Sequence, residues 1–156
     1  MIRRLTVAVL AAGLLLVGGT GGAVAAPTTE TIHHKGLVET FVEVIPSCDG
    51  GGPRYSITTT SNVVEHQTIF ADGRVHATFT QTGTFVAEPL SGSNRPSYTG
   101  KFTIWGGFNQ NGKSVNGTFT FNVRGTGSDG STFRNHVTAH FNQRPDGSVN
   151  EFFHCH

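Results

Sequence analysis

Histidines concentrate near the C-terminus, with a spacing that could bind a metal ion. His136 and His140 lie four residues apart, and His154 and His156 follow close to the chain end. If the two segments pair as a hairpin, His136 faces His156, with His154 two residues away on the same face. Imidazole nitrogens bind Zn and Cu, so this register predicts a site at His136, His154 and His156. His140 lies about 13 Å along its strand from His136, too far to share that ion.

The alternative for these histidines is a polar outer face on which imidazoles are tolerated without a ligand. No carboxylate is evident at a position that would orient the rings, as metal-binding histidines usually require. A terminal strand is also a poor rigid support for a metal site. No cofactor is therefore required by the sequence, and Zn or Cu binding is an expectation for experiment.

Phenylalanines form a second group of candidates, for binding an apolar molecule. Alternation places them on the same face of several expected strands, with Gly100, Gly106, Gly117 and Gly125 leaving space between them. The expected lining residues are Phe79, Phe102, Phe119, Phe121 and Phe141. An apolar pocket with a few polar groups is typical of a small-molecule site. The alternative is a filled interior, because small barrels generally pack their lumen.

A few polar residues share that apolar face, and these are the candidates for acid–base catalysis. They are Glu151, Tyr98 and either Glu65 or His66. A two-residue loop at Asp72-Gly73 would turn His66 inward, whereas a three-residue loop would turn Glu65 inward. A buried Glu151 with a raised pKa could then act as an acid or base beside Tyr98 or His66. The sequence contains neither Gly-x-Ser-x-Gly nor His-Glu-x-x-His, which favours a protein that is not an enzyme.

The chain has two cysteines, Cys48 and Cys155, which we expect to form a disulfide in an exported protein. The bond would close a loop of about 107 residues. It would tie the last strand to the end of an N-terminal strand. A thiolate metal site is disfavoured because there is no Cys-x-x-Cys spacing.

Two turns of the same kind position the C-terminal histidines. The turns are Ser128-Asp129-Gly130-Ser131 and Pro145-Asp146-Gly147-Ser148. Asp-Gly suits a three-residue hairpin loop that combines a type I turn with a glycine bulge. Such loops pair Phe121 with Val137 and Val137 with Cys155, which gathers apolar side chains on one face. A slip of one residue would bury the polar face instead, so the hydrophobic pattern supports this register.

Alternating residues and turn signals predict further strands upstream, at residues 37–45, 55–60, 63–70, 74–87 and 98–109. Residues 26–36 lack periodicity and are expected to form a loose N-terminal lead. The residues 88–96 form the longest irregular connection, of the kind that often carries binding determinants at a barrel mouth. About eight strands without a helical pattern predict an all-β antiparallel up-and-down meander. We expect one domain over residues 37–156, closing as a barrel to remove sheet edges, with a β-sandwich as the alternative.

Residues 1–25 are a predicted Sec-type signal peptide. Arg3 and Arg4 precede an apolar run from Leu5 to Val17, and small residues precede a cut before Ala26. The run is shorter than the roughly 20 residues of a membrane-spanning helix, so we expect a secreted, extracellular protein without a stable membrane anchor. In the mature part, nine basic residues face ten acidic ones. This balance argues against nucleic acid as a partner, because nucleic acid binding needs a clustered basic excess.

The strand Phe119–Arg124, the turn Gly125–Ser131, the pair His136 and His140, and a cysteine near the end are similar to a known group of proteins. They resemble the small exported β-barrel proteins, largely uncharacterised, of actinobacteria, over roughly residues 75–156. The resemblance implies export and a β-barrel and carries over no activity. The ending after Glu151 departs from that group, so the resemblance adds nothing to the histidine site.

These features together predict a secreted, non-catalytic binding protein that holds an apolar small molecule in the mouth or lumen of a barrel. One alternative is a surface interaction protein that uses Trp105, Phe152 and the threonine rows of the outer face. The other is an enzyme that acts on an apolar substrate with a carboxylate in the lumen. The sequence leaves the partner open, with an apolar small molecule as one candidate.

Overall fold

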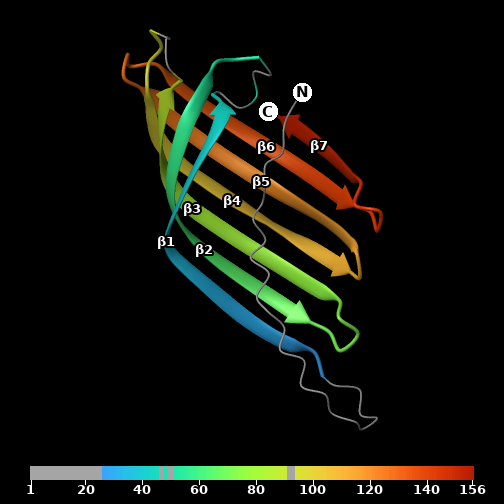
Figure 1. Ribbon diagram of the computed structural model, residues 1–156. Coiled ribbons are helices and arrows are strands. Elements are labelled where there is room, and N and C mark those ends of the chain that lie inside the picture. Colours follow the sequence, from blue (N-terminus) through green and yellow to red (C-terminus); the bar gives the residue numbers. More distant parts are fainter. Residues whose placement is uncertain (1–25, 46–47, 49–50, 91–93) are drawn as a thin grey trace.

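The structure is a computed structural model that describes residues 26–45, 48, 51–90 and 94–156. The predicted signal peptide at residues 1–25 lies outside the described residues. Seven β-strands make up the fold (Figure 1): β1 (Thr28–Val44), β2 (Arg54–Ile69), β3 (Val75–Pro89), β4 (Tyr98–Asn111), β5 (Ser114–Gly127), β6 (Thr132–Gln143) and β7 (Val149–Cys155). The described residues include no helix long and apolar enough to cross a membrane.

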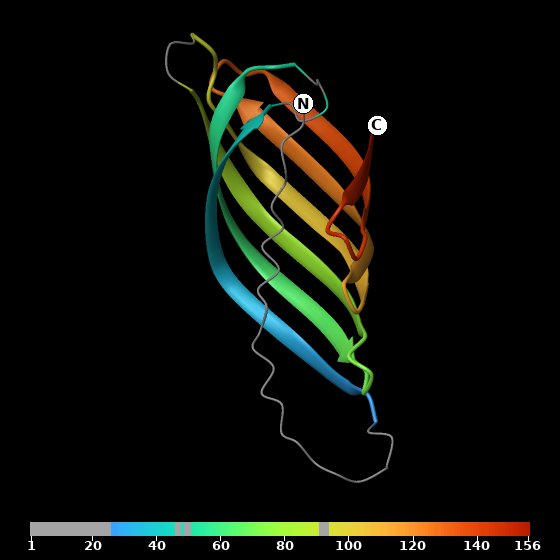
Figure 2. The ribbon, with the colours of Figure 1, turned by 45° about the vertical axis from the view of Figure 1, so that its right-hand side comes forward.

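The strands form one antiparallel sheet in the order of the sequence, which confirms the all-β meander. The sheet is strongly curved, with β1 and β7 at its two edges (Figure 2). Within the described residues no backbone pairing joins β1 to β7, so the predicted closure into a hydrogen-bonded barrel is wrong. One physical reason is the length of β7, whose seven residues pair with only part of β6. A single sheet is also not the β-sandwich considered as the alternative.

The count of strands is seven because two expected segments merge. The predicted break at Ser61-Asn62 does not occur, and β2 pairs with β3 without interruption from Tyr55 to Ile69. The irregularity lies instead on β1, where the register shifts between His34 and Leu37. Gly36 adopts a positive φ of 66° there, and its backbone N–H donates to Asn62 Oδ1 at 3.0 Å. Asn62 therefore supports a bulge in the neighbouring strand.

The N-terminal lead expected at residues 26–36 is also wrong, because β1 begins at Thr28. This half of β1 is an edge with mostly exposed side chains, for example His33 and His34. A strand with little burial has no apolar alternation for sequence reasoning to detect. Its backbone hydrogen bonds to β2 hold it in the sheet.

The Asp-Gly turns are as predicted. Gly130 and Gly147 have φ values of 83° and 84°, and each loop holds three residues between the paired backbone groups. In the second turn, Ser148 donates to Asp146 from both its backbone N–H, at 2.9 Å, and its hydroxyl, at 2.7 Å. The hydroxyl bond and then the backbone bond hold the pKa of Asp146 below its usual range. The predicted pairing of Val137 with Cys155 is confirmed.

The third Asp-Gly turn settles which residue of β2 faces inward. Phe70 and Arg74 pair around a loop of three residues, since the Phe70 N–H donates to the Arg74 carbonyl at 2.9 Å. Glu65 is consequently opposite Phe79, on the same face as the core. His66 points to the opposite face, where its Nδ1 lies 2.8 Å from Thr31 Oγ1.

The core lies on one face of the sheet, called here the inner face, at the end where β2 starts and β3 finishes. It consists of Ile45, Tyr55, Ile57, Phe85, Ala87, Phe102 and Val123, with Tyr98, Ile104, Phe121 and Phe133 packed against it. The opposite face, called the outer face, carries mainly threonine, asparagine, histidine and charged side chains. The apolar face expected from alternation is therefore confirmed.

Glycines of the inner face lie directly opposite phenylalanines of the neighbouring strand. Phe85 is opposite Gly100, and Phe141 is opposite Gly117. A Cβ atom on Gly100 would lie 2.6 Å from Phe85 Cε1, and one on Gly117 would lie 2.5 Å from Phe141 Cε1. Phenylalanine rings thus fill the space over these glycines. The interpretation that the glycines leave room for a ligand is wrong at these positions.

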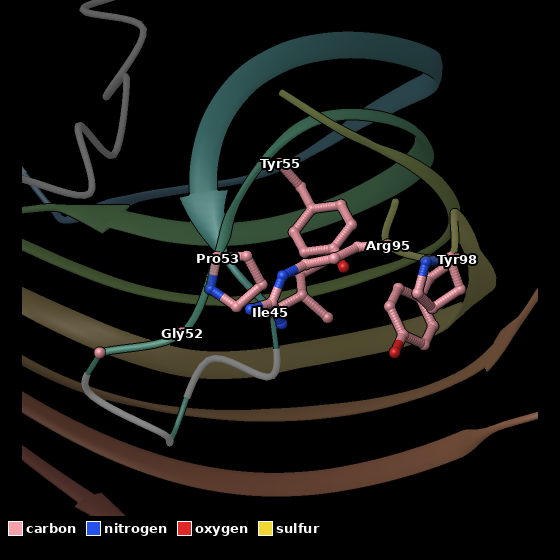
Figure 3. Close-up of a pocket in the computed structure, with 8 residues that line it drawn as sticks. Ile45, Gly52, Pro53, Tyr55, Arg95 and Tyr98 are labelled. Atoms are coloured by element: carbon pink, nitrogen blue, oxygen red, sulfur yellow. The ribbon is translucent and has the colours of Figure 1, made fainter. Parts of the chain in front are cut away.

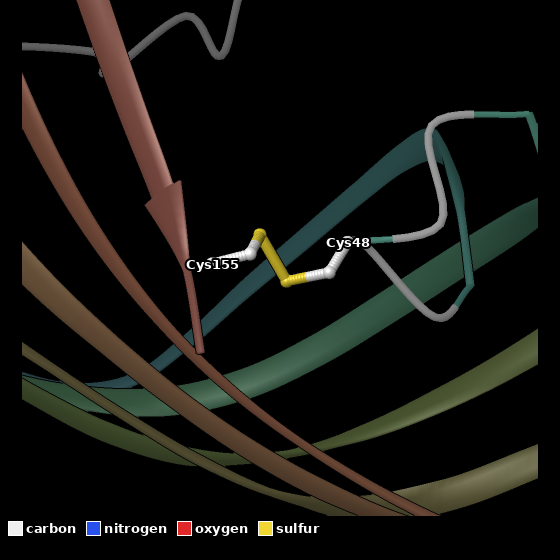
Figure 4. Close-up of a disulfide and its surroundings, with 2 residues drawn as sticks. All are labelled: Cys48 and Cys155. Carbon is white, nitrogen blue, oxygen red and sulfur yellow. A yellow bond between two sulfur atoms is a disulfide. The ribbon is translucent and has the colours of Figure 1, made fainter.

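The predicted disulfide between Cys48 and Cys155 is present, with Cα atoms 5.8 Å apart. Figure 4 shows that it joins the end of β7 to the connection that follows β1. The bond thereby links the two edges of the sheet in place of backbone hydrogen bonds. The disulfide therefore gives β7 a second attachment to the fold, because β6 is the one strand that pairs with β7.

Candidate functional site

A hollow of about 460 Å³ opens at the end of the sheet that carries the core. Its lining comes from described residues between β1 and β2, the start of β2, the connection before β4 and the start of β4 (Figure 3): Ile45, Gly51, Gly52, Pro53, Tyr55, Arg95, Pro96 and Tyr98. We call this hollow the mouth site. Of the connection expected at residues 88–96, Arg95 and Pro96 line this hollow; a role of this connection in binding stays a prediction.

Two tyrosines form one wall of the mouth site. The rings of Tyr55 and Tyr98 meet edge to face, with centroids 5.7 Å apart and planes at 68°. Phe133 holds Tyr98 from another side, with centroids 5.4 Å apart. The register fixes both tyrosines, because Tyr98 is opposite Ala87, and Tyr55 is opposite Pro89 two residues further along β3. Aromatic pairs of this geometry are rigid, which preorganises the wall for a ligand.

Tyr55 is 1% exposed and belongs to the core as well as to the mouth site. Burial raises the pKa of its hydroxyl above the usual 10.0, and Tyr98 adds to the rise, whereas the charge of Arg95 acts in the opposite direction. The hydroxyl of Tyr55 is consequently neutral at physiological pH. It can offer a hydrogen bond at the site and cannot serve there as a base.

Arg95 brings a positive charge to the mouth site. Its side chain is exposed and lines the hollow. Among the described residues the ion pair present is Arg74 with Asp72, so Arg95 has no carboxylate partner there. A guanidinium offers a planar set of donors that matches a carboxylate, sulfonate or phosphate. Sequence reasoning selected Tyr98 but missed Tyr55 and Arg95, because neither belongs to a recognisable motif.

The five phenylalanines expected to line one pocket are divided by the core. Phe102 and Phe121 lie within or against the core, with ring centroids 6.2 Å apart. Phe79, Phe119 and Phe141 lie on the inner face beyond it and are partly buried. Neither the mouth site nor the hollow described below is lined by all five. Ligand binding by this set stays a prediction.

The three candidates for acid–base catalysis lie far apart. Tyr98 is at the mouth, whereas Glu151 is exposed on β7 and pairs with Phe141 towards the opposite end of the sheet. His66 is on the outer face. The fold therefore assembles no acid–base pair from these residues, since proton transfer requires hydrogen-bonding distance.

The histidine rings come together as the hairpin register predicts. The ring centroids are 5.3 Å apart for His136 and His156, and 4.3 Å apart for His154 and His156. His136 Nδ1 donates to Asn122 Oδ1 at 2.6 Å, which fixes that ring. In the part of the chain that the structure describes, however, no group of three or more His, Cys, Asp or Glu side chains is arranged to hold a metal ion. The rings would have to reorient to bind one.

Binding of Zn or Cu at His136, His154 and His156 stays a prediction that titration calorimetry can check. We expect Zn to release heat on mixing with the native protein and that this heat disappears in His156→Ala, which removes the central ring. His33→Ala is the matched control, because His33 is an exposed outer-face histidine on β1. Equal heats from the native protein and His156→Ala would contradict the prediction.

A second hollow, of about 410 Å³, lies across the end of the sheet remote from the mouth site. Its polar lining includes His76, Asn109, Asn116, Asn142 and Asn150, which stand side by side on β3 to β7. Sequence reasoning missed this row. The hairpin registers contained the signal, because they place the four asparagines opposite one another.

No protein-family model matches the chain, and neither a curated protein nor a solved structure shows significant similarity to it. The geometry of the two hollows is therefore the basis for the proposed function.

Proposed function

We propose that this protein is a secreted, non-catalytic binding protein that holds a small molecule at the mouth site. The observation that carries the proposal is the pairing of an aromatic wall, Tyr55 and Tyr98, with the guanidinium of Arg95, which has no ion-pair partner among the described residues, around one hollow. The chemistry of this lining selects a ligand with an apolar or aromatic body and one anionic group.

The size of the mouth site supports a small ligand. Its volume of about 460 Å³ lies within the range of roughly 300 to 1,000 Å³ that is usual for small-molecule sites. Ile45, Pro53 and Pro96 add apolar surface for the body of the ligand. Ile45 and Tyr55 of the lining belong to the core cluster that also contains Phe85 and Phe102, so the site adjoins the packed core.

Two features of the chain support the secretion that we propose. A disulfide suits an oxidising compartment, and the sequence begins with a signal-peptide pattern. The separation of Glu151, Tyr98 and His66 supports a non-catalytic role, because these three residues lie at different ends or on different faces of the sheet. The alternative of interaction through the outer face rests on the separate hollow there.

An anilinonaphthalene sulfonate dye tests the proposal, because it combines an aromatic body with one anionic group. We expect saturable fluorescence enhancement that weakens by roughly tenfold or more in Arg95→Gln, since a hydrogen bond to a charged group contributes about 1.5 to 3 kcal/mol. Tyr98→Leu should weaken binding as well, through loss of the aromatic wall.

Arg124→Gln is the matched control, because Arg124 is exposed on the outer face of β5 and has the same charge. It should bind the dye as the native protein does. Equal dye affinity for the native protein, Arg95→Gln and Tyr98→Leu would rule out the mouth site as the binding place. Native mass spectrometry of protein from its own culture medium would then show whether any ligand is retained.

A further inference from the structure

Asparagine, threonine and histidine side chains make up most of the polar lining of the hollow on the outer face. One row crosses five strands, since His76 is opposite Asn109, Asn109 is opposite Asn116, Asn116 is opposite Asn142, and Asn142 is opposite Asn150. Neighbouring strands lie about 4.8 Å apart, so the row presents one polar group at each such step. Within the described part of the chain, no Asp, Glu, Lys or Arg side chain lines this hollow.

Hydrogen bonds within the row orient part of it. His76 Nδ1 donates to Asn109 Oδ1 at 2.7 Å, and Asn109 Nδ2 donates to Asn116 Oδ1 at 3.4 Å. These two hydrogen bonds do not use the amide N–H groups of Asn116 or the Nε2 atom of His76, so these atoms can bond to other partners. Among the described residues, the side chains of Asn142 and Asn150 make no hydrogen bond, so their donors and acceptors are available to a ligand.

The adjacent row adds depth and an aromatic surface. Gly107 stands between Thr78 and Thr118, and its missing side chain deepens the hollow. Beyond Thr118 come His140, whose Nδ1 lies 2.9 Å from Thr118 Oγ1, and then Phe152 on β7. The side chain of Phe152 is 69% exposed, the largest exposure among the exposed large apolar residues. An apolar ring in this position can gain free energy when a ligand covers it.

From this arrangement we propose that the outer-face hollow binds a neutral oligosaccharide. Each sugar ring presents neighbouring hydroxyl groups that both donate and accept hydrogen bonds, and an asparagine amide supplies a donor and an acceptor together. The C–H face of a sugar ring packs against an aromatic ring such as Phe152. The absence of charge in the lining selects an uncharged ligand, because a charged one would lose its hydration without an ionic partner. This site is separate from the mouth site and does not depend on it.

Titration with cellohexaose, chitohexaose, maltohexaose and mannohexaose tests this proposal. Trp105, the single tryptophan of the chain, is 41% exposed and lies two residues from Gly107 on the outer face, so its fluorescence reports on the hollow. We expect at least one of the four sugars to bind saturably by fluorescence and calorimetry. Phe152→Ala and Asn142→Ala should each weaken that binding at least tenfold.

Two controls separate this site from other effects. Val86→Ala removes an exposed apolar side chain of the outer face at the other end of β3 and should leave sugar binding unchanged. Arg95→Gln, at the mouth site, should also leave it unchanged. Circular dichroism should show the same fold in each variant, since Phe152 and Asn142 are exposed.

The protein should be produced in a host without N-glycosylation, because Asn116-Gly117-Thr118 matches the acceptor sequence and Asn116 lies in the hollow. Glycosylation of Asn116 should abolish binding of free sugar. The proposal is overturned if none of the four oligosaccharides binds, or if Phe152→Ala and Asn142→Ala bind them as tightly as the native protein does.

Discussion

The double variant Cys48→Ser/Cys155→Ser should lose about 4 to 5 kcal/mol of unfolding free energy, the largest effect that we expect from removing a covalent bond in this fold. The disulfide closes a loop of 107 residues, and the chain-entropy model gives a cost of this size for releasing such a loop. Urea denaturation followed by Trp105 fluorescence measures the change.

In the double variant, local unfolding should begin at β7. All seven residues of this strand are exposed, and β6 is its one partner in the sheet. Hydrogen exchange should therefore show faster exchange at Phe153 and at the neighbouring amides of β7 than at the core strand β3. Native protein treated with a reductant serves as the control and should match the double variant. An unchanged urea midpoint in both would show that the bond does not contribute to stability.

Gly100→Ala should destabilise the protein by about 3 kcal/mol, at the upper end of the range for overpacking. A Cβ atom at this position would collide with the backbone carbonyl of Arg124 on β5 and lie 2.6 Å from Phe85 Cε1. The ring of Phe85 can turn only into the core, and the carbonyl belongs to a paired strand. Both strands must therefore shift. Thermal and urea unfolding measure the cost.

Lys101→Ala is the matched control for Gly100→Ala, because Lys101 is the next residue and is exposed on the outer face. Its unfolding free energy should change by less than about 0.5 kcal/mol, as for surface substitutions in general. If Gly100→Ala is as stable as Lys101→Ala, the packing of phenylalanine rings over glycine does not constrain this sheet.

The candidate sites show how far sequence reasoning reached. The approach of His136, His154 and His156 was predictable because it needs only two hairpin turns and the alternation of a strand. Tyr98 was selected as a polar residue on an apolar face. Sequence reasoning could not select Arg95, because its place at the mouth site depends on the conformation of the irregular connection between β3 and β4.

The sequence by itself determined the local features of this protein. The Asp-Gly turns at Gly130 and Gly147 set the last two hairpins, since only a residue that tolerates positive φ fits there. These turns and the apolar alternation then set the registers from β5 to β7. The pairing of Cys48 with Cys155 followed from the number of cysteines.

Only the tertiary structure decided how the sheet ends and what fills its faces. Whether β1 meets β7 depends on the accumulated curvature of all seven strands and on the short length of β7, which no local pattern encodes. Similarly, the sequence does not show whether the space above a strand glycine is an empty pocket or is filled by an aromatic ring of the next strand. The packing of Phe85 over Gly100 and of Phe141 over Gly117 resolves this in favour of the rings, because close packing of apolar atoms stabilises the fold more than an empty space would.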